Sequence, residues 1–119
     1  MTAVLLKGAP VAQQITERLA ADVAALAARG ITPGLVSVQV GEDDASRIYR
    51  NQQEKKAAAL GIRYTRLDLP AATAEAQLGA QIAALNADPA VHGIILQTPL
   101  PKGINLEAMQ GAIDPRKDV

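Results

Sequence analysis

Apolar and polar residues alternate along the chain in a way that predicts helices and strands in turn. A helix is predicted over residues 8–30, with Pro10 at its first position and Gly30 as its stop. Its apolar stripe comprises Val11, Ile15, Leu19, Val23 and Leu26. Strands are expected at residues 34–41, 63–70 and 91–97, and further helices at 45–61, at about 73–86 and at 105–113. This alternation indicates the α/β fold class, here a three-layer α/β/α domain with a mostly parallel sheet.

The helix expected at residues 45–61 is polar in its middle. On a helical wheel, one arc of about 120° holds the apolar residues Ala45, Ile48, Ala59 and Leu60 together with Tyr49, Gln52, Gln53 and Lys56. A core-facing arc would not carry an amide and an ammonium at its centre, because burying them unpaired is costly. Ligands bind at the carboxyl ends of parallel strands, where GEDDAS (41–46) and QTPLP (97–101) are expected. We therefore expect the middle of this helix to face a solvated pocket.

Composition restricts the class of protein further. The chain has 119 residues, 49% of them hydrophobic, which is typical of one globular domain with a real core. Its formal net charge of zero gives no electrostatic reason to expect nucleic acid or an anionic membrane as a partner. No apolar run is long enough to span a bilayer and no signal peptide is recognisable. The absence of cysteine excludes disulfides and thiolate metal sites and fits a cytoplasmic protein.

Three separated motifs carry a resemblance to a known family. The stretches VGEDDASRIYRNQQEKKAAALGI, LNADPAVHGIILQTPLP and IDPRKDV resemble the methylenetetrahydrofolate dehydrogenase/cyclohydrolase family. The resemblance covers essentially the whole chain and implies that residues 1–119 are the N-terminal, folate-binding catalytic domain. It implies that the C-terminal Rossmann domain, which holds NADP in the family, is absent from this chain, which also has no G-x-G-x-x-G sequence.

The resemblance also implies an activity and a set of partners. The family oxidises methylenetetrahydrofolate to methenyltetrahydrofolate with NADP, and hydrolyses the product to formyltetrahydrofolate, in one-carbon metabolism and purine biosynthesis. We therefore expect a tetrahydrofolate substrate, NADP on the missing domain, and a cytoplasmic homodimer for the full-length protein. The fragment alone is expected to be inactive, and neither nucleic acid, a membrane nor a metal is expected as a partner.

Individual residues take their roles from the same resemblance. Tyr49, Gln53 and Gln97 correspond to the catalytic set, in which the glutamine of the Q-x-P-L-P motif orients a lysine. The substrate-binding residues implied are Ser46, Tyr49, Gln97, Pro99 and Leu100. The family motif reads Y-x-x-x-K, so Gln53 stands where the lysine belongs. The family's pterin-binding aspartate follows K-D-V, and this chain ends at Val119, one position earlier.

The exchange of lysine for Gln53 has a chemical consequence. Hydrolysis of a methenyl group needs protons moved to and from water, and a glutamine amide has no titrating proton. Hydride transfer needs mainly the alignment of two carbons. The exchange therefore puts the cyclohydrolase step in doubt more than the dehydrogenase step. Lys56, about one turn later, is a candidate to replace the lysine in part, although a solvated position is the simpler expectation.

Other interpretations of these residues stay open. Tyr49 is compatible with a half-buried packing residue and Gln97 with a strand-end cap. His92 has no second ligand near it in sequence, which disfavours a metal site. Asp43 and Asp44 are expected to place negative charge at a helix N-terminus.

Two other classes of protein remain as alternatives. One is a non-catalytic module that binds folate. The other is a phospho-receiver domain, suggested by Asp43–Asp44 and by Lys102 after a strand. A receiver needs more strands than the three expected here, and an acceptor aspartate at the end of the middle strand.

Overall fold

A computed structural model describes residues 8–119, with side chains from Gln14 onward. The elements, in chain order, are α2 (Gly8–Ala28), β1 (Gly34–Val40), α3 (Asp44–Leu60), β2 (Arg63–Leu69), α4 (Glu75–Ala87), β3 (Gly93–Leu96) and α5 (Leu106–Ala112). Each predicted element is present, with ends that differ from the prediction by at most two residues. Helix α2 already begins at Gly8, so Pro10 lies inside its first turn and is not its first residue. The side chain of Val11, part of the predicted stripe, lies outside the described residues.

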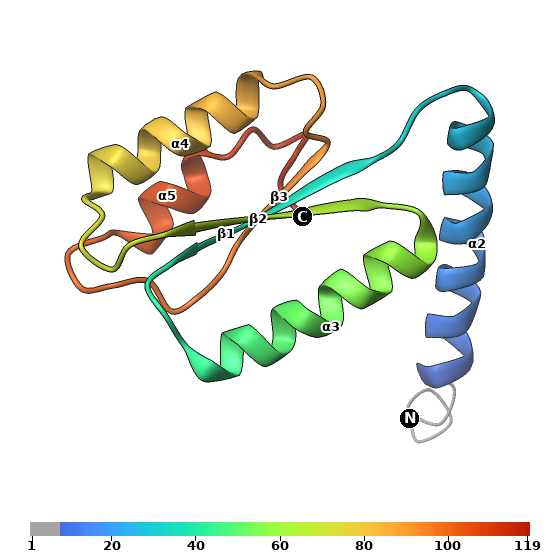
Figure 1. The fold of residues 1–119 in the computed structure, drawn as a ribbon, viewed down its shortest axis with the longest axis horizontal. Coiled ribbons are helices and arrows are strands. Elements are labelled where there is room, and N and C mark those ends of the chain that lie inside the picture. The colour runs from blue at the N-terminus through green and yellow to red at the C-terminus, as the bar shows by residue number, and fades with distance from the viewer. Residues whose placement is uncertain (1–7) are drawn as a thin grey trace.

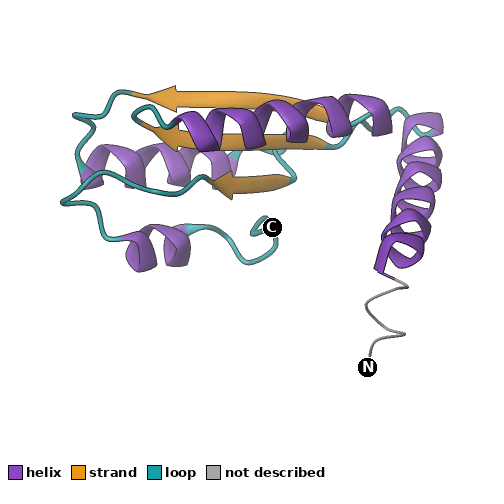
Figure 2. Ribbon diagram, turned by 90° about the horizontal axis from the view of Figure 1, so that it is seen from below, coloured by secondary structure: helices purple, strands orange, loops and turns teal. Residues whose placement is uncertain are grey.

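The three strands form one parallel sheet in the order β2-β1-β3. Helices α4 and α5 lie on one side of this sheet and α3 lies on the other (Figure 1). The same layers are visible from below in Figure 2, where the strands point in one direction. The predicted α/β class, with three layers and a parallel sheet, is confirmed.

The two faces of the sheet differ in character. The face toward α4 and α5 is apolar, and Val36, Val38 and Val40 of β1 pack there against Leu78 and Ile82 of α4. This cluster also contains Val91, Ile94, Met109 and Ile113, with Leu67, Leu69, Leu85, Leu96, Leu100 and Ile104 packed around it. Burial of these side chains supplies the hydrophobic stabilisation of the domain.

The opposite face, toward α3, carries polar side chains at its centre. Ser37 and Gln39 of β1 alternate with the core valines and are 0% and 7% exposed. In the β1–β2 register, Ser37 lies beside Arg66 and Gln39 beside Asp68. Because paired residues of neighbouring strands point to the same face, this side of the sheet is polar across two strands. A helix that covers it must bring polar groups of its own.

Helix α3 brings polar side chains to this face of the sheet, but from a different side of the helix than the one predicted. Its buried residues are Ser46, Arg50 and Ala57, whereas Ile48 is 57% exposed and Lys56 is also exposed. The predicted inward arc is therefore wrong by about one residue of rotation about the helix axis. It placed Ala45, Ile48, Gln52, Lys56 and Ala59 toward the sheet. Two other members of the arc, Gln53 and Leu60, are half-buried. The physical reason is Arg50, which is 2% exposed and faces the sheet. A polar inward face is present, and an arginine is at its centre.

Helix α2 stands apart from the layers, beyond the C-terminal end of α3 (Figure 1). Val23 is buried and packs at Gly61, the residue that caps α3 with a φ of 81°. Ile15 and Leu19 are 61% and 39% exposed, so the predicted apolar stripe of α2 is not covered along its length. Among the described helices, none is both long enough and apolar enough to cross a membrane.

Candidate functional site

A cleft of about 590 Å³ lies between α3 and the free edge of β3. It contains three of the residues that the sequence singled out, namely Tyr49, Gln53 and Gln97. The full lining is Pro33, Gly34, Leu35, Tyr49, Gln53, Ile62, His92, Gly93, Ile95, Leu96, Gln97, Thr98 and Val119. Most of these side chains are apolar and a few polar groups converge at one end, which is typical of a small-molecule site.

The polar end of the cleft is built by Gln53 and Gln97. The Nε2 of Gln97 donates to the Oε1 of Gln53 at 3.1 Å, and the same oxygen accepts from the Tyr64 hydroxyl at 2.9 Å. Gln97 follows β3 directly and is fixed there by its backbone N–H, which donates to the Val38 carbonyl at 2.8 Å. Parallel pairing of β1 with β3 therefore determines where the Gln97 side chain lies.

Behind this pair, Ser37 and Arg50 continue the polar network into the domain. Gln97 Nε2 donates to Ser37 Oγ at 2.9 Å, and Arg50 Nε donates to the same oxygen at 2.9 Å. The Arg50 guanidinium also donates to the Ser37 carbonyl at 2.9 Å, to Gln39 Oε1 at 2.6 Å, and to the Asp68 carboxylate. A buried guanidinium is tolerated only when acceptors surround it, and here they come from two strands.

Tyr49 lies beside this network on the outer part of the cleft. It comes one residue before Arg50 on α3, and it is 55% exposed although it lines the cleft. An aromatic ring in this half-open position can stack on a planar ligand. Its exposure also means that replacing it changes the cleft more than the core.

The other predicted substrate residues, Ser46, Pro99 and Leu100, are not among the residues that line the cleft. The buried Ser46 hydroxyl donates to the Thr98 carbonyl at 2.9 Å, which ties the start of α3 to the loop after β3. Thr98–Pro99 is a cis peptide bond, and Pro99 is exposed. Leu100 is half-buried and packs against the hydrophobic core. Ser46 therefore contacts the loop that follows β3, whereas Leu100 contacts the hydrophobic core on the other side of the sheet.

The N-terminus of α3 is capped as expected for an acidic residue at that position. The Asp43 carboxylate accepts from the Ser46 backbone N–H at 2.8 Å, and Asp44 lies in the first turn. Hydrogen bonds from the Ser46 backbone and then its side chain lower the pKa of Asp43 below its ordinary value of 3.8. The cap fixes where Ser46 and the following turn of α3 begin, and so positions the helix over the cleft.

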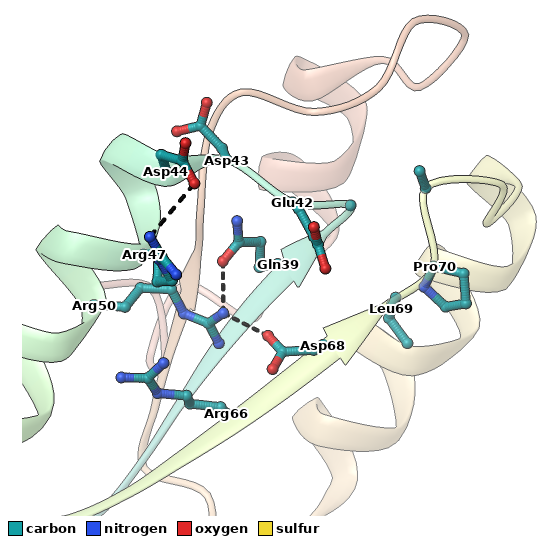
Figure 3. Close-up of a pocket in the computed structure, with 12 residues that line it drawn as sticks. Gln39, Glu42, Asp43, Asp44, Arg47, Arg50, Arg66, Asp68, Leu69 and Pro70 are labelled. Atoms are coloured by element: carbon teal, nitrogen blue, oxygen red, sulfur yellow. Dashed lines mark hydrogen bonds and ion pairs between the residues drawn. The ribbon is translucent and has the colours of Figure 1, made fainter.

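A second pocket, of about 740 Å³, lies at the carboxyl ends of β1 and β2. Figure 3 shows Arg50 reaching from α3 to Gln39 and Asp68 at its floor, with Arg47 paired to Asp44. Arg66 also lines this pocket and is paired with Glu54 at 3.0 Å. Because its arginines are already paired with carboxylates, this pocket offers an anionic ligand little uncompensated positive charge.

The C-terminal IDPRKDV stretch has a structural role in this domain. The Lys117 ammonium donates to the carbonyls of Leu85, Asn86 and Asp88 at 3.1, 2.8 and 2.8 Å, which satisfies the end of α4. Lys117 is followed by Asp118, which forms an isolated parallel bridge with Ile94 on the free edge of β3. The chain end is thereby held beside the cleft, and Val119 contributes to the cleft lining.

The ionisable side chains that line the cleft are those of Tyr49 and His92. His92 lies at the other end of β3, with Nδ1 accepting from the Gly34 backbone N–H at 2.9 Å. At about 3.3 Å per residue, the five steps from His92 to Gln97 correspond to roughly 16 Å. The polar end of the cleft is therefore rich in hydrogen-bonding groups and poor in groups that can exchange a proton. Among the described residues, no cluster of acidic or histidine side chains could hold a metal ion.

Sequence reasoning missed Ser37, Arg50 and Tyr64, which support the cleft from behind. A signal for them is present in the strands. Polar residues recur at every second position of β1 and β2, at Ser37 and Gln39 and then from Tyr64 to Asp68. Alternation of this kind predicts a polar sheet face, and the face predicts a polar partner on the covering helix.

The fold and the cleft define a class of protein: a parallel α/β domain with a cleft that runs between one helix and the edge strand β3. The family model described as tetrahydrofolate dehydrogenase/cyclohydrolase, catalytic domain, matches residues 6–119. The chain belongs to this family.

Relatives and solved structures agree with this assignment. The chain is 48% identical to the bifunctional protein FolD of Rhodospirillum rubrum over 120 residues, and 44% identical to that of Levilactobacillus brevis over 115 residues. These alignments cover 100% and 97% of this chain. A crystal structure of the FolD enzyme of Campylobacter jejuni superimposes with a TM-score of 0.89 at 32% identity, covering 95% of this chain and 40% of that one.

A second solved structure bears on the cofactor. The Trypanosoma brucei enzyme, described as complexed with NADP cofactor and inhibitor, superimposes with a TM-score of 0.82 at 36% identity. That match covers 92% of this chain and 37% of the other. This chain spans about 40% of the length of the curated FolD relatives. It corresponds to their N-terminal part, as the resemblance predicted.

Proposed function

We propose that this domain binds reduced folate in the cleft between α3 and β3, as the N-terminal part of an NADP-dependent methylenetetrahydrofolate dehydrogenase whose cyclohydrolase step is impaired. The observation that carries the proposal is Gln53. By the resemblance of its sequence motif, it corresponds to the family's lysine; in the structure it lines the cleft and is hydrogen-bonded to Gln97. The site keeps the partner that would orient a lysine and has an amide in the lysine's place.

In this proposal the residues of the cleft bind and align the substrate. The ring of Tyr49 stacks on the folate, and the amides of Gln53 and Gln97 hold the polar atoms near the reacting carbon. Alignment of this kind is what hydride transfer requires. Hydrolysis also needs a group that takes a proton from water and returns it, and neither amide can do so. The cleft is therefore suited to oxidation and poorly suited to hydrolysis.

NADP does not fit the residues of this chain. The sequence contains no G-x-G-x-x-G loop in which backbone N–H groups could cradle a pyrophosphate. We therefore assign the cofactor to a second, Rossmann domain that would follow this one in a longer protein.

The experiment that tests the proposal replaces Gln53 in the longer protein that carries this domain. Gln53→Lys should raise cyclohydrolase activity by about 10²-fold or more, the usual contribution of a positioned acid–base group. Dehydrogenase activity should change much less, because the hydride moves between carbons. The gain should depend on pH, since an ammonium can lose a proton and an amide cannot.

Lys56→Ala is the matched control, because Lys56 lies on the same helix, is exposed and does not line the cleft. We expect it to leave both activities nearly unchanged. An unchanged rate of hydrolysis in Gln53→Lys, combined with its loss in Lys56→Ala, would show that the lysine function has moved along α3. That result would refute the role assigned to Gln53.

The loss of the titrating lysine also favours a second candidate, a module that binds folate without catalysis. It predicts folate binding in the same cleft and no dehydrogenase activity in any longer protein. A measurable rate of methylenetetrahydrofolate oxidation in the parent protein separates the two.

A further inference from the structure

A continuous chain of hydrogen bonds crosses the polar face of the sheet and ends at the cleft. It runs from Tyr64 on β2 to Gln53 on α3, then to Gln97 after β3, to Ser37 on β1, and back to Arg50 on α3. Each contact measures between 2.9 and 3.1 Å. This series of hydrogen bonds connects all three strands, or the residue that follows them, with helix α3 at the polar end of the cleft.

The order of donors and acceptors along this chain fixes the amide of Gln97. A guanidinium can only donate, so Ser37 Oγ accepts from Arg50. The Nε2 of Gln97 donates to Ser37 and to Gln53, which uses both of its N–H bonds. The Oε1 of Gln97 is then the atom left for a ligand.

The amide of Gln53 is fixed in the opposite sense. Its Oε1 accepts from Tyr64 and from Gln97, so both lone pairs of that oxygen are used. Its two Nε2–H bonds are left for the cleft that the residue lines. The end of the cleft therefore offers a ligand one NH₂ donor and one carbonyl acceptor, held side by side.

We propose that Tyr64 and Ser37 are positioning residues, which act through Gln53 and Gln97 to present this donor–acceptor pair to a reduced folate. Neither residue lines the cleft, so neither touches the ligand. A folate ring carries adjacent amide-type donors and acceptors, and a preorganised pair binds them without ordering two flexible side chains first. The identity of the ligand rests on the proposed function, whereas the fixed amides are a property of the domain alone.

The test uses ¹⁵N relaxation of the side-chain NH₂ groups in the free domain. Tyr64→Phe removes only the hydroxyl. The order parameter of the Gln53 NH₂ should then fall from a value typical of a rigid group to less than about 0.6. Ser37→Ala should do the same for Gln97. Thr65→Val is the matched control, because it removes a hydroxyl from the next residue of β2, on the other face of the sheet. It should leave both NH₂ groups unchanged.

Binding of formyltetrahydrofolate, measured by calorimetry, gives the functional arm. Tyr64→Phe should weaken it about three- to tenfold, the range of one net hydrogen bond, and Thr65→Val should not. A Gln53 NH₂ that is equally ordered in the parent and in Tyr64→Phe overturns the positioning role, even if folate binds. Ordered amides that respond as expected in a domain that binds no folate would support the positioning role and refute the proposed function.

Discussion

Replacing Arg50 by leucine should destabilise the domain by about 2–4 kcal/mol, although the side chain is charged and is not part of the hydrophobic core. Arg50 is 2% exposed and donates to Ser37 Oγ, the Ser37 carbonyl, Gln39 Oε1 and Asp68. Leucine would remove the donors to Gln39 Oε1 and to the Ser37 carbonyl, whereas Ser37 Oγ would keep its hydrogen bond from Gln97. Each buried acceptor that loses its partner costs about 1–3 kcal/mol, and part of that is offset because a guanidinium no longer has to be desolvated.

The contribution of Asp68 to this network should be much smaller. Its side chain is 64% exposed, so its ion pair with Arg50 is partly screened by water. Asp68→Asn keeps an oxygen that accepts from Arg50, and should cost about 1 kcal/mol or less. The contrast between Arg50→Leu and Asp68→Asn therefore separates buried hydrogen bonding from ion pairing.

Urea denaturation followed by circular dichroism measures these free energies of unfolding. A double variant, Arg50→Leu with Gln39→Leu, removes the donor together with one acceptor, and should recover about 1–2 kcal/mol relative to Arg50→Leu. The reasoning fails if the free energy of unfolding of Arg50→Leu lies within about 1 kcal/mol of that of the parent, which is the uncertainty expected for such a difference. It also fails if the double variant is less stable than the single one.

Three further outcomes are expected. Lys117→Met should lower the free energy of unfolding by about 1–3 kcal/mol in urea denaturation, because three carbonyls at the end of α4 lose their donor, whereas Lys102→Met on an exposed loop should stay within about 0.5 kcal/mol. Hydrogen bonds from Arg116 lower the pKa of Asp114 from 3.8 to about 2, so its stabilising effect should be complete above pH 3.8 and lost as the pH falls toward 2. Carbon NMR titration of Asp114 in the parent and in Arg116→Gln measures that shift, which should become smaller in the variant but should not vanish, because the backbone N–H of residue 116 still donates to the carboxylate. Residues 1–119 alone should show no measurable NADP binding by calorimetry, and micromolar affinity would contradict the assignment of the cofactor to another domain.

The elements of the fold follow from the sequence because local signals agree with the final packing. The apolar run of β3, the glycine stop at Gly61 and the acidic start of α3 each mark an element that the structure contains. The start of α4, expected at about Thr73 and found at Glu75, was less well predicted because this helix has no strong cap residue where it begins. Ala74, which precedes α4, has no side-chain oxygen to accept from the first turn.

The orientation of α3 could not be predicted from an apolar-stripe rule. That rule assigns the inward face to Ile48 and Ala59 because it treats arginine as a solvent-facing residue. In the structure Arg50 is buried, because Ser37 and Gln39 supply acceptors from a strand that is distant in sequence. Only pairing of the strand alternation with the helix pattern would have identified the correct face.

The most direct test of the folate cleft is calorimetric titration of the domain with formyltetrahydrofolate, in the parent and in two neighbouring variants. Tyr49 and Ile48 are 55% and 57% exposed on the same helix, but only Tyr49 lines the cleft. Weak binding to the parent is expected, weakened about tenfold by Tyr49→Ala, the effect of losing an aromatic stacking partner. Ile48→Ala should change it less than about twofold, which corresponds to under 0.5 kcal/mol. Equal affinity in the parent and Tyr49→Ala, or no binding to the parent at all, would contradict the location of a folate site between α3 and β3.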